Sequence, residues 1–333
     1  MTDNRRPLPD AGAGLRAHWG RRVLVADGAM GTMVQAAGLD ESAYAGYDGC
    51  VEILNVTRPE AIAAIHAAYL EAGADLIGTN TFGANLTALA EYGLIGRLEE
   101  LALAGAKLAR AAADAAASPG RPRFVLGSMG PGTKLATLGQ VAYADLRDAY
   151  QAAAGALVAG GVDALLIETC QDLLQAKAAV AGAKRARAAA GGDQPIIVHV
   201  TIETTGAMLI GSDVSAVVAT LVPLGVDGLG FNCATGPAEM AEPLRQLARH
   251  APVPISAMPN AGLPELTPAG AVYPLGPTRF AAQVAGLADD CGLAVVGGCC
   301  GTTPDHIRAL AAAWAEGAAP AGQVAGAAGA ATA

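Results

Sequence analysis

The chain has 333 residues, of which 53% are hydrophobic and 15% charged, so it can bury a large core and reads as a globular protein. Its 30 acidic residues outnumber 21 Lys and Arg residues, which argues against binding to nucleic acid or to an anionic membrane surface. Residues 1–19 lack the apolar core of a signal peptide, and no long run of strongly apolar residues follows, so we expect a cytoplasmic protein without a membrane span.

Eight short apolar runs recur along the chain, and each precedes a turn and an Ala- and Leu-rich segment long enough for a helix. In chain order the predicted strands cover residues 22–28, 75–82, 123–130, 163–170, 195–202, 227–233, 254–260 and 293–300. A Gly-x-Asp tripeptide introduces three of these strands, at residues 73–75, 161–163 and 225–227. Glycine is the usual residue just past a helix end, so these tripeptides indicate helix-to-strand loops.

Strands separated by helices must run parallel, and eight such units are typical of a closed barrel. The sequence therefore predicts an α/β fold, a single-domain (β/α)8 TIM barrel over residues 20–315. We expect an N-terminal extension over 1–19 and a flexible Ala- and Gly-rich tail or linker over 316–333. An open doubly wound sheet is the alternative, but no G-x-G-x-x-G motif follows the first strand. The long segment 35–55 is expected to form part of the barrel rim.

Two of the six cysteines, Cys299 and Cys300, are adjacent and flanked by glycines, and Cys233 ends the sixth predicted strand. Side chains alternate along a strand, so adjacent cysteines can share one direction only where the strand ends. The ends of the sixth and eighth strands open on one barrel mouth, where the three thiols can converge. Three thiolates with a vacant position are typical of a catalytic zinc site; a vicinal disulfide or small core residues are the alternatives.

A zinc ion that already has three thiolate ligands is better suited to binding a fourth sulfur than to activating water. A substrate thiol, with a usual pKa of about 8.5, would be bound there as a thiolate and so become a strong nucleophile at neutral pH. Alkyl transfer to sulfur is the predicted reaction class. A redox role, in which Cys299 and Cys300 cycle as a disulfide, instead predicts activity that is indifferent to chelators.

Seven segments resemble, in order, the motifs of the homocysteine S-methyltransferase family. They are DGAMGTM (27–33), TNTFGAN (79–85), GSMGPGTKL (127–135), ETCQDLLQAKAA (168–179), NCATGP (232–237), PNAGLP (259–264) and GGCCGTTPDHI (297–307). The resemblance spans roughly residues 20 to 315. It implies a (β/α)8 barrel that transfers a methyl group to the sulfur of zinc-bound L-homocysteine and so forms methionine.

The resemblance also implies which residues hold the metal. Cys233, Cys299 and Cys300 match the three catalytic zinc ligands of the family. Asn260, in PNAGLP, matches an asparagine that can occupy the fourth position when no substrate is bound.

For the substrate, the resemblance implies that Asp27 and Glu168 hold the ammonium group of homocysteine. Backbone N–H groups around Gly28 and Ala29 are expected to receive its carboxylate, and Asn232 is a further expected substrate-binding residue. Elementary chemistry agrees, because carboxylates pair with ammonium and a glycine-containing turn presents donors to an anion.

The segments TNTFGAN, PNAGLP and GGCCGTTP look most similar to the N-terminal homocysteine-binding module of cobalamin-dependent methionine synthases. This similarity implies methylcobalamin as the methyl donor, carried by a separate or missing corrinoid and folate-domain partner. A stand-alone enzyme that uses S-methylmethionine or betaine is the alternative. An alternative of another class is a non-catalytic protein that binds zinc or homocysteine.

Overall fold

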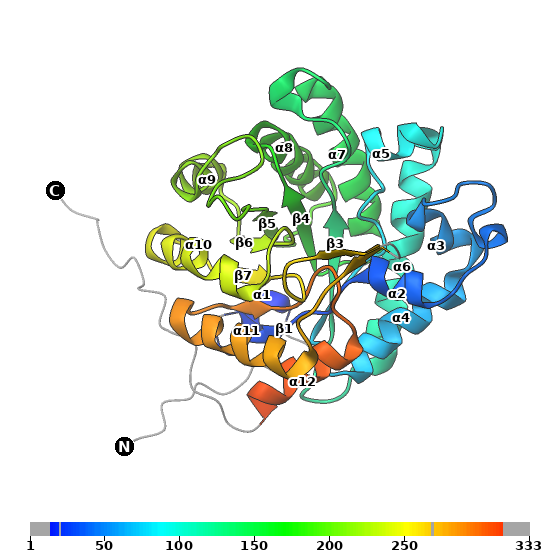
Figure 1. The fold of residues 1–333 in the computed structure, drawn as a ribbon. Helices are drawn as coiled ribbons and strands as arrows, with labels where there is room; N and C mark the ends of the chain where they lie inside the picture. The colour runs from blue at the N-terminus through cyan, green and yellow to red at the C-terminus, as the bar shows by residue number, and fades with distance from the viewer. Residues whose placement is uncertain (1–13, 20, 268–269, 316–333) are drawn as a thin grey trace.

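The computed structural model describes residues 14–19, 21–267 and 270–315, and a parallel barrel of eight strands forms its centre (Figure 1). The strands are β1 (Leu24–Val25), β2 (Leu76–Gly78), β3 (Phe124–Met129), β4 (Ala164–Cys170), β5 (Ile196–Val200), β6 (Gly228–Asn232), β7 (Ile255–Met258) and β10 (Val295–Val296). Their order is β1-β10-β7-β6-β5-β4-β3-β2, and a parallel bridge between Ala26 and Leu76 joins the two ends. The predicted barrel is confirmed, and every barrel strand falls within its predicted range.

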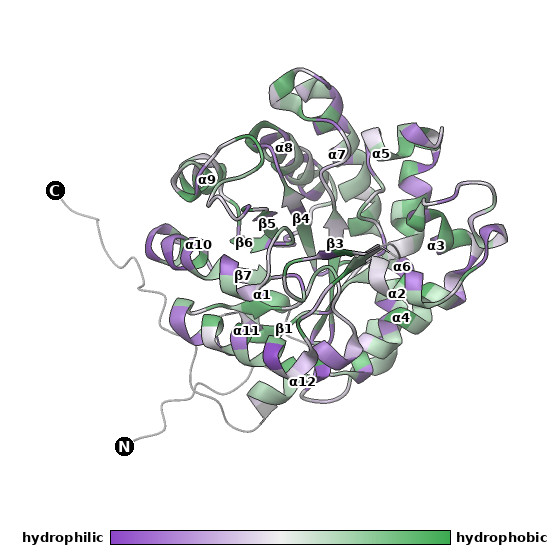
Figure 2. Cartoon of the chain, in the orientation of Figure 1, coloured by the Kyte–Doolittle hydropathy of each residue, from purple (hydrophilic) through white to green (hydrophobic). Residues whose placement is uncertain are grey.

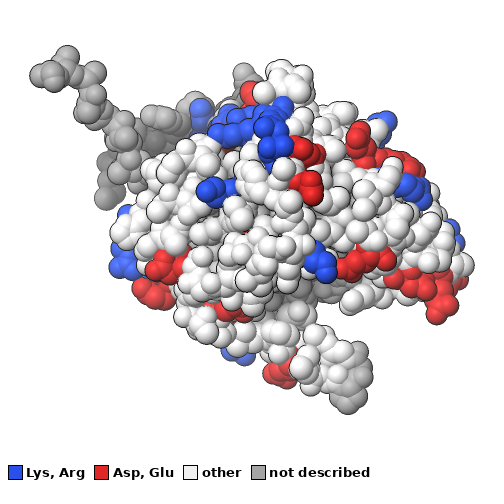
Figure 3. All heavy atoms as spheres, turned by 90° about the horizontal axis from the view of Figure 1, so that it is seen from above, with Lys and Arg blue, Asp and Glu red and all other residues white. Residues whose placement is uncertain are grey.

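Helices surround the barrel on the outside (Figure 1). They are α1 (Leu15–His18), α2 (Met30–Ala36), α3 (Leu54–Thr57), α4 (Pro59–Glu71), α5 (Leu86–Glu91), α6 (Leu98–Ala116), α7 (Tyr143–Ala159), α8 (Leu173–Ala189), α9 (Val214–Leu221), α10 (Pro237–His250), α11 (Pro277–Cys291) and α12 (Pro304–Ala315). Hydrophobic residues fill the strands, and hydrophilic residues are spread over the outer helices (Figure 2). One side view shows small groups of charged residues on a mostly uncharged surface (Figure 3). Among the described helices, none has the length and apolar character that a bilayer crossing requires.

The Gly-x-Asp tripeptides also link neighbouring strands of the barrel through their Asp side chains. In each, the Asp carboxylate accepts a hydrogen bond from a backbone N–H of the preceding strand and pairs with an Arg side chain. The three sets are Asp75 with Val25 and Arg22, Asp163 with Val125 and Arg110, and Asp227 with Ile196 and Arg187. These carboxylates join β1 to β2, β3 to β4 and β5 to β6 at the amino end of the barrel. Ala294 occupies the corresponding position before β10.

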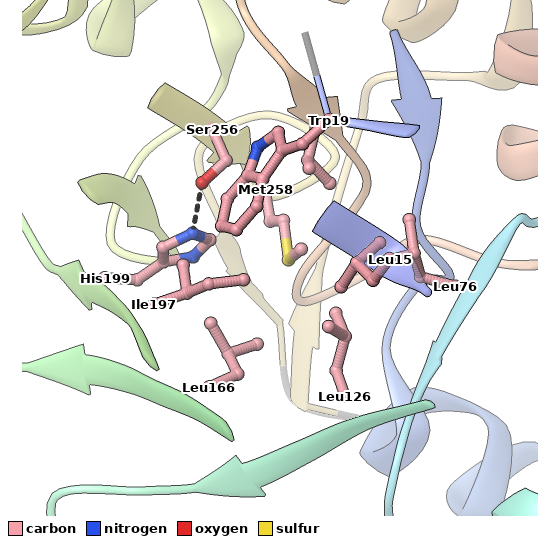
Figure 4. Close-up of a pocket in the computed structure, with 10 residues that line it drawn as sticks. Leu15, Trp19, Leu76, Leu126, Leu166, Ile197, His199, Ser256 and Met258 are labelled. Carbon is pink, nitrogen blue, oxygen red and sulfur yellow. Dashed lines mark hydrogen bonds between the residues drawn. The ribbon is translucent and has the colours of Figure 1, made fainter. Parts of the chain in front are cut away.

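Apolar side chains fill the amino half of the barrel interior. Figure 4 shows Leu15 and Trp19, from the N-terminal segment, facing Leu166 and Ile197 around a small internal cavity. His199 also lies there, and its Nε2 is 2.6 Å from Ser256 Oγ. Burial lowers the pKa of His199 to about 3, so the ring is neutral. Because apolar side chains fill this end of the barrel, a functional site is expected at the carboxyl ends of the strands.

Two segments shape that end. The segment 35–55 contains two short 3-10 helices, η1 (Glu41–Tyr44) and η2 (Val51–Ile53). It packs on the loop after β2, where Gly83 N donates to Glu52 Oε1 at 2.6 Å. The connection from β7 to α11 contains an antiparallel hairpin, β8 (Glu265–Thr267) with β9 (Gly270–Val272), which was not predicted. The expected tail, 316–333, and most of the expected extension, 1–19, lie outside the described residues, so these boundaries remain predictions.

Candidate metal and substrate site

Three cysteines meet at the carboxyl end of the barrel. Cys233 follows β6, whereas Cys299 and Cys300 lie in the loop after β10. Their sulfur atoms all lie within 4.8 Å of one another, and Cys233 Sγ is 3.8 Å from Cys300 Sγ. A tetrahedral zinc ion with bonds of about 2.3 Å would hold its sulfur ligands about 3.8 Å apart. The thiols thus converge as the sequence predicts, and they could hold a metal ion.

The local backbone explains how neighbouring cysteines reach one point. Cys233 has a φ of 61°, in the left-handed region, which turns the chain sharply as β6 ends. Cys299 and Cys300 lie beyond the end of β10, so the strand alternation no longer applies to them. Cys299 N donates to Pro259 O at 2.8 Å, and Ala261 N donates to Cys300 O at 2.9 Å. Cys233 N likewise donates to Met258 O at 3.1 Å, so backbone hydrogen bonds to β7 and the loop that follows it hold both cysteine loops in place.

The three thiols share their protons unequally. Hydrogen bonds from the Cys233 and Cys299 thiols lower the pKa of Cys300 to about 3. Hydrogen bonding with Cys233 and Cys300 raises the pKa of Cys299 well above its usual value. The cluster consequently loses one proton readily and resists losing more. A bound cation would be needed to hold three thiolates together.

Two acidic side chains, Asp27 and Glu168, lie at the same mouth. Asp27 follows β1 and accepts a hydrogen bond from Gly78 N at 2.8 Å, whereas Glu168, on β4, accepts one from Ser128 Oγ at 2.5 Å. Burial raises the pKa of Asp27 well above its usual value and that of Glu168 to about 7. Among the described residues, no Lys, Arg or His forms an ion pair with either carboxyl group. Such a pair of buried acids is a suitable site for a ligand ammonium group.

The turn after β1 is tightly packed. A side chain at Gly28 would approach Thr302 Oγ1 to 2.5 Å and Tyr69 Oη to 3.0 Å, so only glycine fits there. Ala29 N donates to Thr302 Oγ1 at 3.1 Å, so this amide already has a partner within the protein. The expectation that amides around Gly28 and Ala29 bind an anion stays a prediction. Thr302 was not assigned a role from the sequence.

Asn260 lies between the two cysteine loops. Its backbone N–H donates to Thr235 O at 3.0 Å, and the next residue, Ala261, is bonded to Cys300 O. The Asn260 side chain is 2% exposed, and its Oδ1 has no hydrogen-bond partner in the described part of the chain. A buried carbonyl oxygen without a partner is costly, which fits an oxygen reserved for a ligand or a metal ion.

The side chain of Asn232 contacts both Glu168 and the cysteine cluster. Its Nδ2 lies 3.3 Å from Glu168 Oε2 and 3.8 Å from Cys299 Sγ. The sequence placed Asn232 at the site but did not predict this contact, nor the hydrogen bond from Ser128 to Glu168. Both contacts join residues from different strands, so no local motif reveals them.

The profile of the family described as homocysteine S-methyltransferase matches residues 24–314. The chain is 57% identical over 293 residues to the methionine synthase of Mycobacterium tuberculosis (strain ATCC 25618 / H37Rv), a match that covers 88% of this chain and 25% of that protein. It is 56% identical to the methionine synthase of Mycobacterium leprae (strain TN), with 88% and 24% covered. The chain therefore spans about a quarter of the length of the curated relatives it matches.

Among solved structures, the metallated form of the homocysteine methyltransferase MmuM from Escherichia coli superposes with a TM-score of 0.66. That match has 24% sequence identity and covers 87% of this chain and 96% of the other. The oxidized form of the same protein has an equal TM-score at 23% identity and the same coverage. At this level of identity the likeness supports the barrel fold alone.

Proposed function

The chain belongs to the homocysteine S-methyltransferase family, and from this membership we infer that its barrel forms methionine by transferring a methyl group to the sulfur of homocysteine. One observation carries the proposal. The three clustered thiols and the two unpaired carboxyl groups, Asp27 and Glu168, open on one barrel mouth. The first group suits a sulfur ligand held through a metal, and the second suits an ammonium group, so together they match the two ends of homocysteine.

We propose zinc as the metal. Cys233, Cys299 and Cys300 would hold it, and their sulfur spacing and soft thiolate character fit that ion. When bound, zinc would supply the positive charge that keeps a substrate thiol deprotonated near neutral pH. The unpartnered Asn260 Oδ1 would complete the coordination when no substrate is present.

The remaining residues would orient the substrate. Asp27 and Glu168 would pair with its ammonium group, whose positive charge would return both buried acids to their ionised form. Amides around Gly28 and Ala29 would face its carboxylate. Held at its ammonium and sulfur ends, homocysteine would present one lone pair of its sulfur toward the open mouth, where a donor can approach in line.

We propose methylcobalamin on a corrinoid domain as the methyl donor. The support is the high identity to two methionine synthases, of whose length the matched region makes up only about a quarter. Large hydrophobic side chains are also exposed on the loops that follow β2, β3, β5 and β7: Phe82, Leu138, Leu209 and Leu266. An apolar rim around the mouth is what a partner domain would cover. The expected folate domain and a cytoplasmic location remain predictions.

The decisive experiment measures methionine formed from homocysteine by the purified, zinc-loaded chain. Methylcobalamin, S-methylmethionine and betaine are supplied in parallel, with a C299A variant as the control. Turnover with methylcobalamin alone supports the proposal. Turnover with either of the other donors replaces the proposed donor, and homocysteine binding without turnover under all three indicates a binding protein.

A further inference from the structure

Thr169 has an unusual backbone conformation within β4. Its φ is 58°, in the left-handed region, where a β-branched side chain is crowded against its own backbone. The pairing of β4 with β5 shifts register between Ile167 and Cys170, on either side of this residue. A strained residue of this kind persists only where its surroundings hold it in place.

Asn232 holds it. Asn232 Oδ1 accepts a hydrogen bond from Thr169 N at 2.7 Å, and Asn232 Nδ2 donates to Thr169 Oγ1 at 2.8 Å. A backbone N–H can only donate, so the carbonyl oxygen of the Asn232 amide must face it and the amide nitrogen must face the hydroxyl. The Asn232 side chain is 1% exposed, so water does not compete for these bonds.

The left-handed conformation of Thr169 changes the direction in which the side chains at the end of β4 point. Leu165 and Ile167 pack in the layer between barrel and helices, whereas Leu166 packs inside the barrel. Regular alternation would send Cys170 inward, yet it packs with Leu165 and Ile167 in the outer layer. The left-handed Thr169 therefore keeps its hydroxyl on the mouth side, next to Glu168, where Asn232 can reach both.

The amide nitrogen of Asn232 also contacts Glu168 and the cysteine cluster. Besides Thr169, it approaches Glu168 Oε2 at 3.3 Å and Cys299 Sγ at 3.8 Å. Its two protons are shared among these three acceptors, and Thr169 Oγ1 is the nearest. One buried side chain thus contacts a carboxyl group of the ammonium site and a thiol of the metal site.

We propose that Asn232 and Thr169 form a clamp that sets the separation between the Glu168 carboxyl group and the cysteine cluster, and so matches the site to the length of homocysteine. This inference rests on the proposed function. In this role both are positioning residues, since they act through Glu168 and Cys299. Homocysteine has a short carbon chain, so its two ends can engage together only if that separation is held; a misplacement of about 1 Å can reduce the rate about 100-fold.

The test compares N232A, T169V and T169S in the full chain, with T201V as a matched control. Thr201 is a buried threonine at the neighbouring end of β5, and its hydroxyl donates to Cys170 O at 3.4 Å rather than to Asn232, Glu168 or a cysteine of the cluster. T169V keeps the branched shape but removes the hydroxyl acceptor, whereas T169S keeps the hydroxyl. Each protein is measured for bound zinc, for the homocysteine Kd by calorimetry, and for KM and kcat separately.

We expect N232A and T169V to bind one zinc per chain and to show a homocysteine Kd and KM raised about tenfold or more. T169S and T201V should remain within about threefold of the wild type. Wild-type homocysteine affinity in T169V, or loss of zinc in T169V, would overturn the clamp even if N232A fails to fold. A wild-type protein that binds no homocysteine would instead overturn the proposed function, and the clamp with it.

Discussion

Cys233 Sγ and Cys300 Sγ lie 3.8 Å apart, although 67 residues separate them in the chain. This distance is too long for a disulfide, whose sulfur atoms are about 2.05 Å apart, and it suits two ligands of one ion. β6 and β10 are the two neighbours of β7 in the sheet, so the loops at their carboxyl ends lie close together.

Replacing any one of Cys233, Cys299 or Cys300 with Ala should remove most of the zinc and abolish methyl transfer, because two thiolates do not fill a stable site. Metal analysis and methionine formation measure the two effects. C291A is the control, since Cys291 is buried in α11 away from the cluster. Full activity in any of the three cluster variants would refute the zinc mechanism.

Removing the metal with a chelator should abolish activity, and adding zinc back should restore it. A disulfide that cycles between Cys299 and Cys300 would respond instead to reductant and oxidant. Activity that survives the chelator but disappears on oxidation would favour this redox alternative. Each step is followed by methionine formation and by a thiol count.

E168Q should weaken homocysteine binding about tenfold or more and leave the zinc content unchanged, because it removes one charge opposite the ammonium group. The pKa of Glu168 is about 7 without ligand, so the carboxyl group becomes neutral as the pH falls below that value. Wild-type affinity should therefore decrease from pH 8 to pH 6 more steeply than that of E168Q. Parallel pH profiles of the two Kd values would remove Glu168 from the ammonium site.

D75N should lower the free energy of unfolding by about 3 kcal/mol, because Asp75 is buried and pairs with Arg22 through two short contacts while accepting a hydrogen bond from Val25 N. D305N is the matched control, since Asp305 pairs with Arg308 on the exposed face of α12 and should contribute less than about 1 kcal/mol. Urea unfolding measures both. Equal losses would show that the carboxylate contributes no more than a surface pair.

Acid should destabilise the fold partly through His66. This side chain is fully buried, and burial lowers its pKa to about 4 from the usual 6.5. A folded-state pKa below the unfolded value means that stability is fully present above pH 6.5 and is lost progressively as the pH falls from 6.5 to about 4. Between pH 7.5 and pH 5 the loss from this group should be about 2 kcal/mol. Urea unfolding at both pH values should show a correspondingly smaller difference for H66L, and an unchanged difference would contradict this assignment.

Local sequence patterns predict much of this protein's fold and candidate site. The eight strands follow from short apolar runs between helical segments, because periodicity and turn residues act over a few neighbouring positions. Cys233, Cys299, Asp27 and Glu168 could be placed at one mouth for the same reason, since each lies at a predicted strand end and parallel strands share that edge. The β8–β9 hairpin was missed because each of its strands has only three residues and β9 begins with a glycine, which leaves no alternating pattern long enough to recognise.

The contacts between these residues could not be predicted from local sequence. The contact of Asn232 with Thr169 joins residues 63 apart, and that of Ala29 with Thr302 joins residues 273 apart. Such pairs depend on which strands lie near one another in the sheet and on the packing of their loops, which no local pattern encodes. The left-handed φ of Thr169 even opposes the intrinsic preference of threonine, and it is held by hydrogen bonds from another strand. Local sequence patterns are thus enough to predict which residues reach the mouth. Their contacts depend on long-range packing, because those bonds form only after distant strands are brought close together.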